Sequence, residues 1–184
     1  MAKHISAENT QILIKRIKKR VPSYKDLANE IVVELSKYFE QTFGKSIPGR
    51  FAQETKDNRP KFIVPLSGGI DSSVVAALAA RAVGPENVLA LTMGSYSGDD
   101  CYAMSYKVVK ALGIEHELID ISEMVNVYLV WTPDCSVNNS KSTREYLIRR
   151  GNFASRIRTA ICYDYQRARR GRILGTINRT EFCQ

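Results

Sequence analysis

One short segment of this sequence combines residue types that could hold a metal-bridged polyphosphate. Residues 67–73 read Ser-Gly-Gly-Ile-Asp-Ser-Ser. The two glycines allow backbone angles that other residues avoid, so a ligand can approach the main chain. Two serine hydroxyls add donors, and a helix beginning here would aim free N–H groups at an anion. Asp71 would repel bare phosphate, but Mg²⁺ is usually held by one or two carboxylates plus substrate phosphates, so the segment predicts Mg²⁺ with a polyphosphate.

The flanking residues predict that this segment is the turn between a strand and a helix. An apolar run at 62–66 is typical of a short buried strand, and residues 74–83 form a helix pattern with no interior breaker. A Walker loop is excluded because residues 67–73 lack its lysine, and the segment does not match the dinucleotide fingerprint. The alternative is a glycine-rich turn that only caps a helix, which the placement of the whole motif between strand and helix disfavours.

Two further segments carry residues suited to binding an anion or a metal. In the first, Asn152 and Arg156 are four apart and would share one face of a helix. Arg156 could grip a phosphate or carboxylate with its planar guanidinium. In the second, the Thr176 hydroxyl could meet a nucleotide and Glu181 could be a second carboxylate on the metal. Read alone, the first segment has a solvated basic helix face as its alternative, and the second a polar loop with a helix cap.

Composition narrows the class of protein. With 184 residues and 44% hydrophobic content, the chain has the length and core of one soluble globular domain. The net charge of +8 suits either nucleic acid or a phosphate-bearing substrate. The basic groups are not interleaved with aromatic residues, which disfavours a nucleic-acid groove.

Other compositional features exclude several kinds of site. The four cysteines are far apart, with no Cys-x-x-Cys pair, so they predict neither a metal cluster nor a disulfide framework and favour a reducing cytoplasm. Two histidines leave little for a nucleophilic triad. We expect no membrane segment and no secretory signal, because no apolar run approaches the roughly 20 residues that a spanning helix needs.

The order of predicted elements indicates an α/β fold, a doubly wound, Rossmann-like parallel sheet of about four to five strands with N-terminal helices. We predict strands at 61–66, 87–93, 117–121 and 172–175. Helices are predicted at 8–20, from a Ser23 cap to Phe43, at 74–83, 99–112, 123–131 and 143–170, the last interrupted at Gly151. A long polar loop at 44–60 separates an N-terminal helical extension, 1–60, from an α/β domain, 61–184. Ligands bind such sheets at the carboxyl ends of the strands, so the loops after strands one, two and four are the candidate site.

Together the three segments resemble the NAD synthetases, a branch of the N-type ATP pyrophosphatases. That family shows Ser-Gly-Gly-x-Asp-Ser, then Gly-Asn-x-x-Ala-Arg-x-Arg-Met, then Gly-Thr-x-x-x-x-Glu. The matching residues here are 67–72, then Gly151, Asn152, Arg156 and Arg158, then Gly175, Thr176 and Glu181. The resemblance spans about residues 61–181 and implies the adenine nucleotide alpha hydrolase type of fold.

The resemblance also implies roles for individual residues. Those implied to bind ATP are Pro65, Leu66, Ser67, Gly68, Gly69, Ile70, Asp71, Ser72 and Thr176. Asp71 and Glu181 would bind Mg²⁺, while Asn152 and Arg156 would bind deamido-NAD. The implied reaction is amidation of deamido-NAD with ammonia through an adenylated carboxylate, with release of AMP and pyrophosphate. No side chain would serve as nucleophile or base, and a homodimer is implied.

The sequence departs from the family pattern at several positions. Ser155 and Thr159 stand where the motif has Ala and Met, and the 44–60 loop resembles an insertion. The family continues past the equivalent of Glu181 into a segment that contributes substrate-binding residues and a fifth strand, which this sequence lacks. We therefore expect a truncated or diverged member. Alternatives are another N-type pyrophosphatase, such as a tRNA-modifying enzyme, or a non-catalytic nucleotide-binding remnant.

Overall fold

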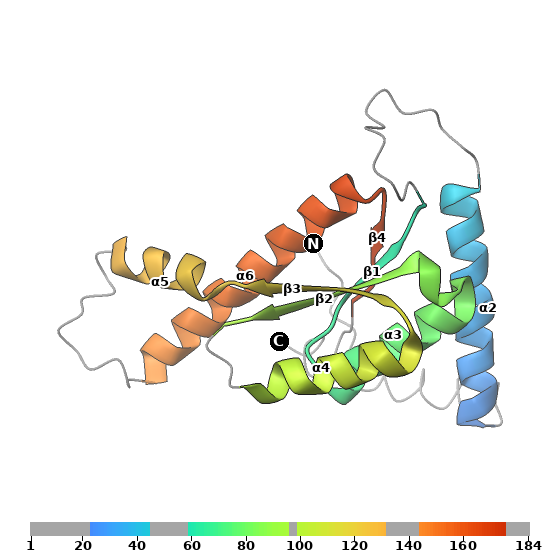
Figure 1. Cartoon of the computed structure of the whole chain (residues 1–184), viewed down its shortest axis with the longest axis horizontal. Helices are drawn as coiled ribbons and strands as arrows, with labels where there is room; N and C mark the ends of the chain where they lie inside the picture. The colour runs from blue at the N-terminus through green and yellow to red at the C-terminus, as the bar shows by residue number, and fades with distance from the viewer. Residues whose placement is uncertain (1–22, 45–58, 96–98, 132–143, 176–184) are drawn as a thin grey trace, which may run out of the picture.

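Four parallel strands form the sheet in the computed structural model, which describes residues 23–44, 59–95, 99–131 and 144–175 (Figure 1). Within these residues the strands are β1 (Phe62–Pro65), β2 (Val88–Gly94), β3 (Glu115–Asp120) and β4 (Arg172–Ile173). Their order in the sheet is β3-β2-β1-β4. Phe62 is in register with Val88 of β2 and with Arg172 of β4. Strand order therefore reverses beside β1, where a doubly wound sheet opens its ligand crevice.

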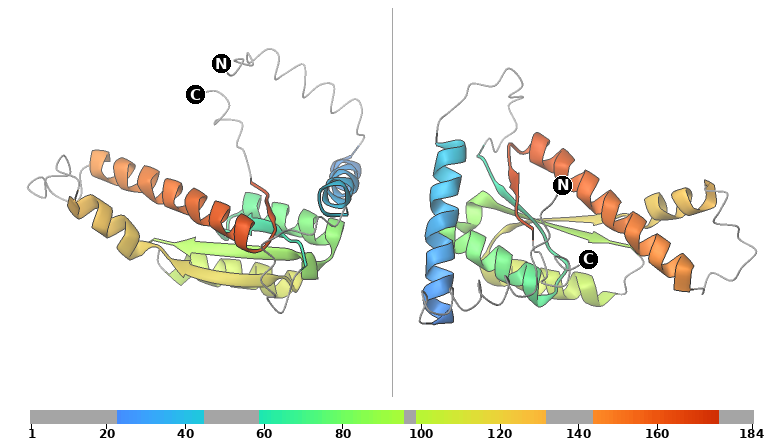
Figure 2. Two further views of the ribbon diagram at one scale, coloured as in Figure 1. Left: turned by 90° about the horizontal axis from the view of Figure 1, so that it is seen from above. Right: turned by 180° about the vertical axis from the view of Figure 1, so that it is seen from behind.

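Helices cover both faces of this sheet (Figure 2). They are α2 (Tyr24–Phe43), α3 (Ile70–Val83), α4 (Asp99–Leu112), α5 (Ser122–Trp131) and α6 (Arg144–Ala168), with a 3-10 turn, η1, at Pro85–Asn87. The α3 and α4 helices lie on one face, with α2 packed along α3, whereas α5 and α6 lie on the other. None of the helices in the described ranges is long and apolar enough to cross a membrane.

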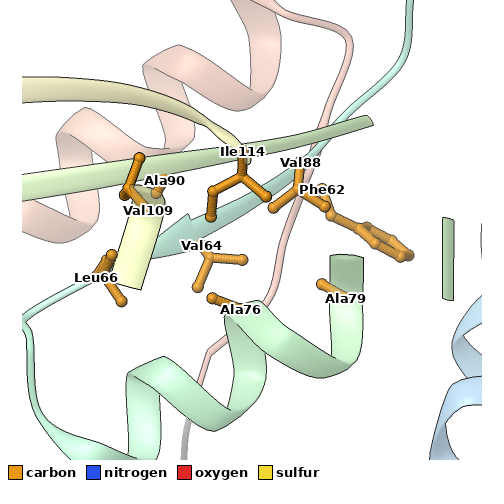
Figure 3. Close-up of a cluster of buried hydrophobic side chains, with 9 residues drawn as sticks. All are labelled: Phe62, Val64, Leu66, Ala76, Ala79, Val88, Ala90, Val109 and Ile114. Carbon is orange, nitrogen blue, oxygen red and sulfur yellow. The ribbon is translucent and has the colours of Figure 1, made fainter. Parts of the chain in front are cut away.

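Alternation of side chains along the strands divides the core into two clusters. Phe62 and Val64 of β1 lie on the face covered by α3 and α4, in one cluster with Ala76 and Ala79 (Figure 3), and the Phe62 ring packs edge-on against Phe39 of α2. Ile63 points the other way, into a cluster with residues of β2 and α6. Both clusters are fully buried around the central strands β1 and β2, because parallel strands with helices on each face have no solvent-facing side. The loop that follows β1 is thus anchored on a largely buried strand.

The predicted doubly wound α/β class is confirmed, and most strands and helices lie close to their predicted positions. The Ser23 cap is also confirmed, since its hydroxyl accepts from the Asp26 N–H at 3.2 Å. The predicted break at Gly151 is wrong: α6 runs unbroken through it, because a long amphipathic helix packed on the sheet absorbs the modest cost of one glycine. The 8–20 helix and nearly all of the 44–60 loop lie outside the described residues. The domain boundary at residue 60 stays a prediction.

Candidate functional site

The turn after β1 has a backbone that only glycine adopts easily. Gly68 has a φ of 80°, in the left-handed region, and Gly69 is the N-cap of α3 with a φ of −74°. Helix α3 begins at Ile70, earlier than the predicted start at residue 74. The second half of the motif is therefore the first helical turn, and the turn itself is only residues 66–69. The backbone N–H groups of that first turn lie at the positive end of the helix dipole.

The serine hydroxyls hold this turn in shape. Ser72, which is 8% exposed, donates from Oγ to the Gly69 carbonyl at 3.1 Å and accepts from the Ser67 N–H at 3.3 Å. Its Oγ is also 3.1 Å from Ser67 Oγ, which accepts from the Gly69 N–H at 3.3 Å. Ser73 Oγ donates to the same Gly69 carbonyl at 2.7 Å. These hydroxyls were predicted as donors to a ligand, but in this structure their hydrogen bonds fix the loop.

Asp71 is exposed in the first turn of α3, where the helix dipole favours a negative charge. Within the described ranges it forms no ion pair. Those ranges also hold no cluster of three or more residues that could ligate a metal. A Mg²⁺ ion held by one or two carboxylates and completed by phosphate oxygens and water fits such a lone, exposed carboxylate. The other predicted metal ligand, Glu181, and the predicted ATP contact, Thr176, lie outside the described residues.

A cavity of about 530 Å³ opens where strand order reverses, between the ends of β1 and β4 and one stripe of α6. Its lining comprises Pro65, Ser155, Arg158, Thr159, Cys162, Tyr163, Gln166, Ile173 and Gly175. Pro65 also leads into the glycine turn, so the cavity and the turn are continuous along the chain. Burial raises the pKa of the Cys162 thiol, which keeps it protonated and unreactive at neutral pH. The ends of the first and fourth strands thus lie at this cavity, and the site predicted at the loops after strands one, two and four stays a prediction.

The structure separates the two residues predicted to bind the dinucleotide from the cavity wall. Asn152 and Arg156 are exposed on α6, and neither lines the cavity. They lie on the adjoining stripe of the helix, each three residues before a lining residue, Ser155 and Thr159 respectively. The side chain of Leu66 is 1% exposed in the core, so its predicted contact with ATP could come only from its backbone and stays a prediction.

Sequence reasoning gave no role to Arg158, which the structure places in the cavity wall. Its Nε donates to the Met93 carbonyl at 3.0 Å, connecting α6 to the end of β2. Spacing was the available signal, because Ser155, Arg158 and Cys162 recur at three and four residues and so share a face of a helix. Spacing alone does not say which face of the helix packs on the sheet, so it could not assign Arg158 to a cavity.

Comparisons with known proteins agree with this geometry. A sequence model of the family described as NAD synthase matches residues 51–184. A protein of Trichlorobacter lovleyi named NH3-dependent NAD+ synthetase is 38% identical over 122 residues, which are 66% of this chain and 41% of that protein. One of Fusobacterium nucleatum with the same name is 33% identical over 159 residues, 85% of this chain and 52% of that protein. The chain thus spans about half or less of the length of these relatives.

Solved structures share the fold. An NH3-dependent NAD synthetase from Campylobacter jejuni, in complex with nitrate, has a TM-score of 0.62 at 26% identity, covering 84% of this chain and 58% of that one. The NMN synthetase of Francisella tularensis has a TM-score of 0.60 at 25% identity, covering 82% of this chain and 55% of that one. Both likenesses cover more than four fifths of this chain.

Proposed function

We propose, on the premise that this chain belongs to the NAD synthase family, that it carries the ATP-binding half of an enzyme that amidates deamido-NAD to NAD with ammonia. The observation that carries the proposal is the turn between β1 and α3. A left-handed glycine, a helix N-terminus and an exposed carboxylate meet there beside a cavity at the switch in strand order. Relatives named NH3-dependent NAD+ synthetases supply the substrate class.

The proposed reaction has two steps. The carboxylate of deamido-NAD attacks the α-phosphorus of ATP, the α–β phosphoanhydride bond breaks, and pyrophosphate leaves. Ammonia then adds to the carbonyl carbon of the acyl-adenylate, loses a proton and displaces AMP, which gives the amide. Neither step needs a protein nucleophile, consistent with the scarcity of histidine in the chain. The task of the protein is to orient the two substrates and to stabilise the charge of the departing pyrophosphate.

Different residues of the chain would bind the phosphates, the metal and deamido-NAD. N–H groups of the first turn of α3, with Gly68 and Gly69 beneath the ligand, would hold the phosphates, and Asp71 would hold Mg²⁺. A bound Mg²⁺ would neutralise charge on the pyrophosphate as it leaves. Asn152 and Arg156 on the rim of the crevice would take deamido-NAD. Thr176 and Glu181, which follow β4 directly, would complete the ATP and metal sites.

The test is a substrate assay with direct binding beside it. This chain is incubated with ATP, Mg²⁺, ammonium and deamido-NAD, and AMP, pyrophosphate and amide product are measured. In parallel, ATP is titrated in the presence and absence of Mg²⁺. We expect Mg²⁺-dependent ATP binding, with equal amounts of AMP and amide wherever turnover occurs. Absence of ATP binding, or release of orthophosphate instead of pyrophosphate, would contradict the proposal.

The Francisella neighbour gives a reason to test a smaller acceptor as well. That protein is named an NMN synthetase, so its product is a mononucleotide amide. The acid form of NMN therefore belongs in the assay beside deamido-NAD. A preference for the mononucleotide would retain the amidation chemistry and change only the acceptor.

We further propose that the protein acts as a homodimer in the cytoplasm, without nucleic acid or membrane partners. In support of a dimer, α5 and α6 expose large apolar side chains, including Val127 (58%), Leu147 (53%) and Ile148 (53%). Burying such a surface against a second copy would remove it from water. Sedimentation analysis should give a dimer mass, and a monomer at micromolar concentration would contradict it.

A further inference from the structure

Arg158 is fixed at one edge of its guanidinium and open at the other. The side chain is partly buried, lines the 530 Å³ cavity and donates from Nε to the Met93 carbonyl at 3.0 Å. A guanidinium has five N–H donors, so the two terminal nitrogens retain four. Of the ion pairs among described residues, none involves Arg158. A planar cation held in one orientation with its terminal edge unused is suited to binding an oxyanion.

Another partly buried arginine of the same region is used differently. Arg169, just beyond the end of α6, pairs with Glu117 at 2.6 Å and with Glu115 at 3.5 Å. The fold therefore supplies carboxylates to a guanidinium whose role is to hold elements together. Among the described residues, Arg158 has a backbone carbonyl as its partner and no carboxylate in an ion pair, so the cation is oriented without being neutralised there.

The other cavity residues make the space around Arg158 favourable for an anion. Ser155, Thr159 and Tyr163 bring hydroxyl groups and Gln166 brings an amide, and among the described residues of the lining none is a carboxylate. Thr159 Oγ1 donates to the Ser155 carbonyl at 3.0 Å, so its position is also set. One cation among neutral hydrogen-bonding groups gives the cavity a positive potential.

The position of the cavity indicates which anion it would receive. Pro65 forms part of its wall and directly precedes the turn at 66–69, where the first N–H groups of α3 become available. A phosphate chain seated on that turn can continue past Pro65 into the cavity. Gly175, which follows the adjacent strand β4 and also lines the cavity, directly precedes Thr176, the predicted ATP contact. A phosphate ester is the chemistry that both neighbours share.

We propose that Arg158 binds a phosphate group of a nucleotide substrate in this cavity and, through Met93, holds the end of β2 beside that phosphate. This role rests on the proposed function and adds to it a second phosphate-binding group, separate from Arg156. ATP and deamido-NAD both carry phosphates, and the experiment distinguishes between them. Loss of the cation should weaken binding of the phosphorylated ligand whose phosphate it contacts, by about tenfold or more, which is typical of a charge-assisted hydrogen-bonded pair.

The test is calorimetric titration of the whole chain with ATP plus Mg²⁺, with deamido-NAD and with adenosine. The variants are Arg158→Gln and Arg158→Lys, and Arg167→Gln removes an exposed arginine from the same helix as the matched control. We expect Arg158→Gln to weaken the binding of ATP or of deamido-NAD at least tenfold and to change the affinity for adenosine by less than twofold. Arg158→Lys should retain part of the affinity that Arg158→Gln loses, and Arg167→Gln should bind as tightly as the unaltered chain.

The results distinguish the possible ligands of Arg158. If Arg158→Gln loses affinity for ATP alone, the ATP phosphates bind at Arg158. If it loses affinity for deamido-NAD alone, the dinucleotide binds there. Equal loss for ATP and adenosine, or a lowered melting temperature that accounts for the change, would assign Arg158 a structural role and overturn the proposal. Unchanged binding by Arg158→Gln would overturn it while leaving the proposed function intact. Failure of the unaltered chain to bind either nucleotide would overturn both.

Discussion

Charged side chains at the two ends of the parallel sheet differ in whether they form ion pairs. At the amino end, Lys61 just before β1 is 1% exposed and forms an ion pair with Glu115, the first residue of β3. Glu117 accepts from Arg169 at 2.6 Å and from the Tyr165 hydroxyl, and Arg169 also reaches Glu115. At the carboxyl end, Asp71 is exposed without an ion pair among described residues, and Arg158 bonds to a backbone carbonyl.

This difference indicates that the charges at the amino end stabilise the fold, whereas those at the carboxyl end are available to a ligand. Burying an ammonium such as that of Lys61 is tolerable only when a carboxylate and further hydrogen bonds compensate, and the Glu86 carbonyl, 3.3 Å from Lys61 Nζ, adds to that compensation. The amino-end network ties α6 to the edge strand β3 and sets their relative position. At the carboxyl end the two charges that form no ion pair among described residues have opposite signs, which suits a metal ion on Asp71 and a phosphate on Arg158.

The largest effect on stability should come from breaking the amino-end network. Glu115→Gln removes the negative charge beside buried Lys61 and should lower the free energy of unfolding by about 2–3 kcal/mol, because the buried ammonium loses the carboxylate of its ion pair. Glu30→Gln on the exposed face of α2 is the control and should change it by less than about 0.5 kcal/mol. Urea denaturation measures both. Equal, small effects would mean that the network is not structural.

At the carboxyl end, Asp71→Asn should have an effect of similar size, but on ATP binding and not on stability. The free energy of unfolding should stay within about 0.5 kcal/mol, because the side chain is exposed. Affinity for ATP in the presence of Mg²⁺ should fall about 100-fold, equivalent to about 2.7 kcal/mol. Without Mg²⁺ the two proteins should bind ATP similarly, since the carboxylate acts through the metal. A variant that binds Mg²⁺-ATP normally would remove Asp71 from the site.

Two glycines should respond to alanine with opposite signs. Gly68→Ala places a side chain at a φ of 80° and should lower stability by about 1–2 kcal/mol while weakening nucleotide binding. Gly151→Ala lies within α6, where an added Cβ meets nothing within 4 Å, and should raise stability by about 0.5–1 kcal/mol. Thermal unfolding of both variants tests the assignment. Destabilisation by Gly151→Ala would show that α6 is not continuous there.

The smallest expected effect is a pH-dependent one at the amino end. The hydrogen bond to the Glu117 carboxylate raises the pKa of Tyr165 from 10.0 to about 12. Because the folded-state pKa is the higher one, the stabilisation is complete below pH 10 and is lost as pH rises to about 12. Tyr165→Phe should therefore cost about 1 kcal/mol at pH 8, and this difference should shrink above pH 10. Tyr106→Phe, at an exposed position, is the control and should give no such trend.

The sequence predicted the carboxyl end far better than the amino end. Residues 67–73 act through backbone conformation and local hydrogen bonds, so their type and order are enough to predict the turn. The amino-end network joins Lys61, Glu115 and Arg169, which are far apart in the chain. Only strand register brings them together, and register does not follow from spacing. Nothing in the sequence pattern gave these three residues a role.

Within the candidate site, the residues that line the cavity were also difficult to predict from the sequence. The sequence identified Arg156 and gave Arg158 no role, because the direction in which a helix faces depends on the packing of Ala154 and Ile157 against the sheet. Ser155 and Thr159, noted as departures from the family motif, both line the cavity. Those departures therefore coincide with the wall that faces the proposed ligand.

The most direct measurement is a crystal structure of the chain with Mg²⁺ and an ATP analogue whose α–β bridge is a methylene group and so cannot be cleaved. The account predicts density for the phosphates over Gly68, Gly69 and the first turn of α3, with the metal on Asp71 and one phosphate within hydrogen-bonding distance of Arg158. Phosphate density at the amino end of the sheet, or an ordered nucleotide that leaves this turn empty, would contradict it.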